Sequence, residues 1–184
     1  VPSFLCQMNS LRQLAFGGNL LQCYSYCLRS STLYYLRVGS TPTCEQDVPT
    51  NISPEERQAL QDLYNSTDGP NWFSYGIPWN FSNADSNPCN DQWYGLICSF
   101  DNHITRLSLN YSNLRGTIPE TIGQLSYLQE LWLHSNHLNG TIPSMIGQLS
   151  SLISLYLNSN LLSGSIPSTI GNLSSLNYVF LNDN

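Results

Sequence analysis

Apolar residues recur with a fixed period of 24 over the second half of the chain. Each unit holds two apolar positions two residues apart, then an Asn or Ser, a Leu, a Gly, an Ile-Pro pair and an Ile-x-x-Leu. In the first unit these positions are Leu107, Leu109, Ser112, Leu114, Gly116, Ile118, Pro119, Ile122 and Leu125. A period of this length predicts a solenoid, in which each unit packs on its neighbours and function lies on an extended surface.

The pattern L-x-x-L-x-L-x-x-N-x-L-x-G-x-I-P-x-x-I-G-x-L resembles the plant-type leucine-rich repeat and runs in register over three consecutive units. The resemblance implies an α/β solenoid with disulfide-closed caps, in which the L-x-L segments are short parallel β-strands on a concave face. A second extended stretch would start at G-x-I-P, and 3₁₀ or irregular turns would form the convex side. The Asn column would hydrogen-bond the backbone of adjoining turns as a ladder. Ser112 takes the place of Asn in the first unit, so we expect the ladder to begin weakly there.

The same spacing fits the N-terminus, where Val1 and Pro2 take the place of the Ile-Pro pair. We therefore expect the chain to enter and to leave in mid-repeat, with neither end capped. Four segments follow from the spacing: a last repeat of a preceding array at 1–22, a C-terminal cap and linker at 23–52, an N-terminal cap at 53–103, and an array of three full repeats and a partial fourth at 104–184.

The predicted N-terminal cap begins with a helix signal. Ser53 can cap the helix, Pro54 suits its first position, and Glu56 completes a capping box. The residues that would share its apolar face are Ala59, Leu60, Leu63 and Tyr64. The segment 63–72 resembles the L-Y-N-x-T-x-G-x-N-W opening of caps in secreted repeats from protists and bacteria. We expect three tryptophans in the cap core, with a ligand role as the alternative: Trp72, Trp79 and Trp93.

Six Cys cluster at the boundaries of the arrays and are absent from the regular repeats, which predicts disulfides and a location outside the cytosol. The segment from Cys89 to Cys98 resembles the C-x-W-x-G-V-x-C signature of plant-type N-terminal caps, with two extra residues, and the resemblance implies that these two Cys pair.

The other four Cys lie in the N-terminal part of the chain. Cys6 and Cys27 are nearly one period apart on neighbouring turns, where the spacing suits a disulfide. They also resemble the L-C-x-L and C-L pair of plant receptor-like repeats. Cys23 would then pair with Cys44 by elimination. The alternative is a zinc site built from Cys23, Cys27 and Cys44, which no nearby His supports.

Composition favours a secreted glycoprotein. Charged residues make up 10% of the chain, all six basic residues are Arg, and the net charge of −6 argues against nucleic acid and anionic membranes. No apolar run reaches the roughly 18 residues of a membrane span. The sequence predicts no metal and no cofactor except N-linked glycans, for which composition alone is the competing explanation of the acceptors. The six acceptors are Asn51, Asn65, Asn80, Asn110, Asn139 and Asn172, with Pro54 weakening the first.

Residues between the paired leucines should face outward on the concave sheet, because side chains alternate along a strand. This places Trp132, Tyr156 and Phe180 in one column at successive repeats. Aromatic rings flanked by amides suit a peptide or a sugar, although stacked rings could also simply fill the concave curve. The predicted ligand-binding residues are Trp132, Tyr156, Phe180, His134, Asn158, Asn182, Tyr178 and Glu130.

Catalysis has little support, because the chain lacks G-x-S-x-G, H-E-x-x-H and a glycine-rich phosphate loop, and His103 stands alone. We expect a non-enzyme. The first hypothesis is an extracellular structural or interaction scaffold that stacks head to tail with itself, as one unit of a fibril-like assembly. The alternative is a recognition ectodomain, resembling plant receptors or polygalacturonase inhibitors, that binds a peptide, protein or glycan on the concave face.

Overall fold

The structure, a computed structural model, describes residues 51–83 and 86–184. The predicted repeat at 1–22 and all but the end of the segment 23–52 lie outside the described residues. The same holds for the pairs Cys6–Cys27 and Cys23–Cys44 and for the alternative zinc site, so these stay predictions.

Helix α1 (Pro54–Ser66) begins with the predicted capping box. The Ser53 hydroxyl accepts a hydrogen bond from the Glu56 amide at 3.1 Å, and the Glu56 carboxylate accepts one from the Ser53 amide at 3.1 Å. Ala59, Leu60 and Leu63 are fully buried, as the apolar face predicted. A short 3₁₀ turn, η4 (Gly69–Asn71), follows the helix.

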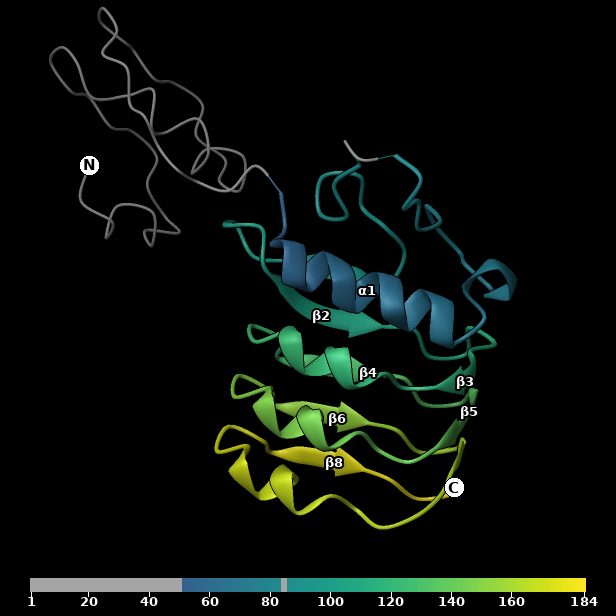
Figure 1. The fold of residues 1–184 in the computed structure, drawn as a ribbon, viewed down its shortest axis with the longest axis vertical. Helices are drawn as coiled ribbons and strands as arrows, with labels where there is room; N and C mark the ends of the chain where they lie inside the picture. The colour runs from purple at the N-terminus through teal and green to yellow at the C-terminus, as the bar shows by residue number, and fades with distance from the viewer. Residues whose placement is uncertain (1–50, 84–85) are drawn as a thin grey trace, which may run out of the picture. The chain divides into compact units, whose positions relative to one another are not determined.

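Five strands form the concave sheet: β1 (Leu96–Cys98), β2 (Ile104–Ser108), β4 (Glu130–Trp132), β6 (Ser154–Tyr156) and β8 (Tyr178–Phe180). They lie side by side in that order, with β1 antiparallel to β2 and the other pairs parallel. Partners in the parallel register are 24 residues apart, as in Leu107, Leu131 and Leu155. Figure 1 shows β2, β4, β6 and β8 stacked one above another, with α1 at the β2 end of the stack. The sequence period is therefore the register of the sheet.

The opposite side of each repeat holds a smaller sheet and a row of 3₁₀ helices. The sheet consists of β3 (Arg115–Thr117), β5 (His137–Gly140) and β7 (Leu161–Leu162). The helices are η5 (Glu120–Gln124), η6 (Ser144–Gln148) and η7 (Ser168–Asn172), which confirms the predicted convex turns. The second stretch was predicted to start at G-x-I-P, but β5 ends at Gly140 and β7 ends before Gly164. In the first unit β3 likewise begins before its glycine, at Arg115, and contains Gly116 despite its φ of 113°. The proline three residues after each glycine cannot donate a ladder hydrogen bond, so each strand ends before it.

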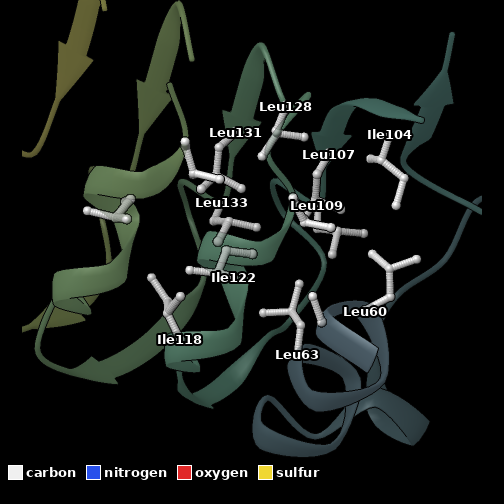
Figure 2. Packing of buried hydrophobic residues seen from close by; sticks show 14 of the residues in the cluster. Leu60, Leu63, Ile104, Leu107, Leu109, Ile118, Ile122, Leu128, Leu131 and Leu133 are labelled. Carbon is white, nitrogen blue, oxygen red and sulfur yellow. The ribbon is translucent and has the colours of Figure 1, made fainter. Parts of the chain in front are cut away.

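The core is one continuous cluster that runs from the cap into the repeats. Figure 2 shows Leu60 and Leu63 of α1 projecting toward the apolar side chains of the first repeat. Each fully buried leucine contributes about 1.5–3 kcal/mol relative to an exposed one, so the stacked columns supply most of the driving force. Trp79 and Trp93 are buried and Trp72 is half-buried, which confirms their expected place in the cap core.

The Asn column forms the expected ladder. The Asn136 side chain accepts hydrogen bonds from the Ser112 and Leu114 amides and donates to the Leu109 and Leu133 carbonyls. One turn further on, the Asn160 side chain accepts from the Leu138 amide and donates to the Leu133 and Leu157 carbonyls. In the first unit the Ser112 hydroxyl bonds to the Asn110 carbonyl and to the Tyr94 hydroxyl of the cap, but to no backbone group of a neighbouring repeat, so the ladder does begin weakly there.

The implied pairing in the N-terminal cap is confirmed. Cys89 and Cys98 form a disulfide with their Cα atoms 5.7 Å apart. The bond ties the loop before β1 to the end of that strand, and β1 pairs with β2 of the first repeat. The disulfide therefore holds the cap against the repeat array.

Candidate functional site

The outward positions of the concave sheet carry the predicted binding residues. Along β4, Leu131 is fully buried, whereas its neighbours Glu130 and Trp132 face outward and are half-buried. The parallel register then aligns Trp132 with Tyr156 and Tyr156 with Phe180. We call these three residues the aromatic ladder.

The rings of the aromatic ladder are in direct contact. Trp132 and Tyr156 stack with their centroids 5.7 Å apart and their planes 11° from parallel. Tyr156 meets Phe180 edge-on, with the centroids at 4.8 Å and the planes at 81°. The Arg106 guanidinium carbon lies 5.1 Å from the Trp132 ring centroid, from the β2 side. Each contact of this kind is worth about 0.5–1.5 kcal/mol beyond area burial, so the ladder is a preordered surface.

Arg106 is fixed by a second contact. One of its guanidinium nitrogens lies 2.6 Å from the Glu130 carboxylate, with both side chains partly exposed to solvent. Arg106 and Glu130 are register partners on β2 and β4, so the sheet itself brings the charges together. This pair neutralises the only charges of β2 and β4 on the outward face, beside Trp132.

The flanking column contains His134, Asn158 and Asn182. The His134 ring contacts Tyr111 at 5.7 Å and Tyr156 at 5.9 Å, measured between centroids. Desolvation by burial lowers the pKa of His134 below its ordinary value of 6.5, so the ring is neutral at pH 7. The two amides donate to adjacent side chains, Asn158 to the Ser159 hydroxyl and Asn182 to the carboxylate of the next residue.

Three buried polar atoms of this surface have no hydrogen-bond partner among the described residues: Arg106 Nε, Trp132 Nε1 and His134 Nδ1. Leaving such a group unpaired costs about 1–3 kcal/mol, so native proteins satisfy most of them. The same surface contains the aromatic ladder.

The structure therefore brings all eight predicted binding residues to one face. Tyr178 lies on β8 beside Phe180, in the column of Glu130, and both rings are about half exposed. The sequence analysis did not predict the contact of Arg106 with Trp132, although Arg106 lies 24 residues before Glu130 and therefore in the same column. It also missed Tyr111, which follows β2 and touches His134. The sequence did contain a sign of this, because the later repeats have Ser135 and Ser159 at the position that Tyr111 occupies in the first repeat.

His103 does not stand alone as expected. Its Nδ1 lies 3.3 Å from the Glu56 carboxylate, and its ring stacks on Tyr127 with centroids 3.7 Å apart. The other oxygen of Glu56 accepts a hydrogen bond from the Ile104 amide at 3.0 Å. These contacts join the start of α1 to the first two repeats. His103 therefore helps to hold the cap against the repeats.

The predicted glycan acceptors differ in exposure. Asn65, Asn80, Asn139 and Asn172 are exposed and lie on α1, the cap loop, β5 and η7, away from the concave sheet. Asn51 and Asn110 are half-buried and have hydrogen-bonded side chains. Asn110 alone of the six lies beside the aromatic ladder, next to Tyr111.

The described residues contain no group of three or more His, Cys, Asp or Glu side chains placed to hold a metal ion. Within residues 51–83 and 86–184, no helix combines the length and the apolar character needed to cross a membrane. The outward face of the concave sheet carries aromatic rings, amides and one ion pair.

A solenoid of stacked 24-residue units with an Asn ladder and a disulfide-closed cap defines a leucine-rich repeat protein. Comparison with known families agrees: residues 53–99 match the leucine rich repeat N-terminal domain, and 103–125, 127–149 and 151–173 each match the Leucine Rich Repeat. The chain belongs to the plant-type leucine-rich repeat family, with the family's N-terminal cap.

Similar proteins include receptors of Arabidopsis thaliana. A probable leucine-rich repeat receptor-like protein kinase is 39% identical over 73 residues, which cover 40% of this chain and 7% of that relative. In the solved BIR3–SERK2 complex, the similar chain is 36% identical with a TM-score of 0.61, covering 70% of this chain and 69% of that one. The leucine-rich repeat ectodomain of the receptor kinase SOBIR1 is 29% identical with a TM-score of 0.58, covering 73% and 69%.

Proposed function

We propose that this chain is a non-catalytic recognition module of an extracellular glycoprotein, and that it binds a protein or peptide partner on the concave sheet. The observation that carries the proposal is the aromatic ladder, a preordered row of rings beside three unpaired buried polar atoms. Clustered aromatic and Arg side chains are the residues that most often dominate binding energy at protein interfaces.

The relatives support a partner of this kind. A similar chain was solved in a complex of two proteins, BIR3 and SERK2, and another is a receptor kinase ectodomain. An ectodomain faces the outside of the cell, where the Cys89–Cys98 disulfide would be stable. A glycan partner is the other candidate for the concave sheet, because aromatic rings also bind sugars.

The proposal is tested by screening the chain against a peptide array and a glycan array. We expect peptide binding that is lost in Trp132→Ala and in Tyr156→Ala, because each variant removes a ring of the ladder. Phe100→Ala is the matched control, since this ring is 69% exposed but lies in the turn before β2, away from the ladder. Binding only to glycans, or peptide binding unchanged in both ladder variants, would refute the proposal.

N-linked glycans form part of the proposal. The four exposed acceptors, Asn65, Asn80, Asn139 and Asn172, would carry glycans on surfaces that leave the concave sheet open. Secretion from a eukaryotic host, followed by peptide mapping with and without enzymatic deglycosylation in heavy-oxygen water, measures occupancy at each site. Unmodified asparagine at all four positions would contradict this part of the proposal.

Self-assembly is a second candidate function. Val179 on β8 is 43% exposed, whereas its register partner Leu155 on β6 is fully buried. This apolar surface beside β8 could stack on another copy of the chain, head to tail, and such stacking can build a fibre. Sedimentation velocity across a range of concentrations, with electron microscopy at the highest, decides the point. Monomers throughout would exclude head-to-tail assembly of this chain.

A further inference from the structure

A second group of exposed rings lies on the N-terminal cap and at the end of β2. Tyr75 is 84% exposed, Tyr111 is 63% exposed and Phe73 is 57% exposed. We call these residues, together with the half-buried Tyr94, the cap strip. Single apolar residues on a surface are ordinary, but a contiguous group is typical of an interaction site.

Specific contacts hold the cap strip together at the end of β2. The Phe73 amide donates to the Ser112 carbonyl at 2.9 Å, and the Tyr94 hydroxyl is hydrogen-bonded to the Ser112 hydroxyl at 3.2 Å. Tyr75 meets the Tyr94 ring edge-on, with the centroids 6.3 Å apart. Ser112 directly follows Tyr111, so the irregular cap loop is anchored beside that ring.

The cap strip is continuous with the aromatic ladder. Tyr111 contacts His134 at 5.7 Å, His134 contacts Tyr156 at 5.9 Å, and Tyr156 contacts Phe180 at 4.8 Å, all between ring centroids. Ring contacts therefore run from Tyr111 to Phe180 across the strands of the concave sheet. The Tyr75–Tyr94 pair joins this row through the hydroxyl of Ser112, the residue that follows Tyr111 in the chain.

We propose that the cap strip and the aromatic ladder form one binding surface, and that its partner is an extended polypeptide segment of net positive charge that contacts both. The inference rests on the proposed function and adds the cap as a second half of the site. Parallel strands lie about 4.8 Å apart, so β2 to β8 alone spans roughly 14 Å, or about four extended residues. Reaching the cap strip requires a longer segment.

The ring contacts favour a polypeptide over a glycan. A sugar ring stacks on the open face of an aromatic ring, but Trp132 has the Arg106 guanidinium on its β2 side and Tyr156 on its β6 side. Tyr156 in turn lies between Trp132 and Phe180. The ladder therefore offers ring edges, which suit carbonyl groups and apolar side chains of a peptide.

The charge of the partner follows from the charge of the module. Residues 51–184 contain ten acidic residues and three Arg, and the Arg106 guanidinium is already paired with Glu130. A negative field of this kind attracts cationic segments and repels acidic ones, with an effect that weakens as salt is added.

The test uses a phage-displayed library of random 12-residue peptides selected on the immobilised 184-residue chain. The tightest peptide is synthesised, and its Kd is measured by calorimetry for the wild type and for Tyr75→Ala, Tyr111→Asn, Trp132→Ala and Phe100→Ala. Asparagine is chosen at position 111 because Tyr111 has a φ of 56°, which asparagine tolerates well. The unfolding midpoint of each variant controls for folding.

We expect Tyr75→Ala and Tyr111→Asn each to raise the Kd by about fivefold or more, as loss of a contact residue does. Phe100→Ala should leave the Kd unchanged, and the selected peptides should be rich in Lys and Arg. If Trp132→Ala abolishes binding but neither cap-strip variant changes the Kd, the ladder binds alone and the inference is wrong. Acidic selected peptides would overturn the charge assignment. Binding that is indifferent to Trp132→Ala would overturn the proposed function, and the inference with it.

Discussion

Replacing Asn160 by alanine should destabilise the repeat array by about 2–6 kcal/mol. The buried Leu138 amide would be left unpaired, at a cost of about 1–3 kcal/mol, and the carbonyls of Leu133 and Leu157 would each lose one of two hydrogen bonds, worth about 0.5–1.5 kcal/mol each. The Asn160 side chain accepts from the Leu138 amide at 3.0 Å and donates to the carbonyls of Leu133 and Leu157 at 3.0 and 3.1 Å. Asn160 is 6% exposed, so water cannot replace these partners without opening the turn.

Urea unfolding followed by tryptophan fluorescence measures this effect. All four Trp lie between residues 72 and 132, so the signal reports on the cap and the repeats. With a slope of about 2 kcal/mol per molar urea, the midpoint should fall by roughly 2 M. Asn158→Ala is the matched control, since this neighbouring amide donates one hydrogen bond of 3.3 Å to Ser159 and should cost less than about 0.5 kcal/mol. Equal midpoints for the two variants would refute the reasoning.

Three further predictions concern the packing, the histidine and the disulfide. Gly147→Ala should cost about 1–3 kcal/mol, because its Cβ would lie 2.4 Å from a backbone oxygen of the next repeat, whereas Gly171→Ala, with open space around it, should leave the unfolding midpoint nearly unchanged. Because burial lowers the pKa of His134 below 6.5, the unfolded chain binds its proton more readily. Stability should therefore fall as the pH drops below 6.5, and His134→Gln should reduce this dependence in midpoints measured at pH 7.5 and 5.5. Replacing both Cys89 and Cys98 by serine should lower the free energy of unfolding by about 2–3 kcal/mol in the same assay, and an unchanged value would show that the loop needs no covalent tie.

The repeat architecture could be predicted because packing and sequence share one period. A fully buried leucine at 107, 131 and 155 is required wherever a strand stacks on the next, so the 24-residue spacing gave the register directly. The start of the small second sheet was predicted too late in each repeat, because its limits depend on backbone hydrogen bonds between β3, β5 and β7 rather than on apolar side chains.

Contacts between distant segments were harder to predict. His103 was expected to stand alone, but its partners Glu56 and Tyr127 come from the helix and from the following repeat. The outward direction of Trp132 could be predicted from strand alternation. The position of the Arg106 guanidinium over the Trp132 ring could not, because it depends on the side-chain rotamers of both residues. The cap strip was missed because Tyr75 lies in a loop with no period, so only the three-dimensional structure shows where it points.

The concave sheet separates the residues that hold the fold from those that are free to bind. Leu131, Leu155 and the Asn ladder face inward and are constrained by neighbours on both sides. The outward column changes from Ser108 to Trp132 to Tyr156 on the successive strands β2, β4 and β6, without any change of register. The fold therefore does not require aromatic rings at these positions, since serine is accommodated there. The contiguous rings are better explained by what they contact outside the chain, and the unpaired polar atoms of Arg106, Trp132 and His134 belong to the same surface.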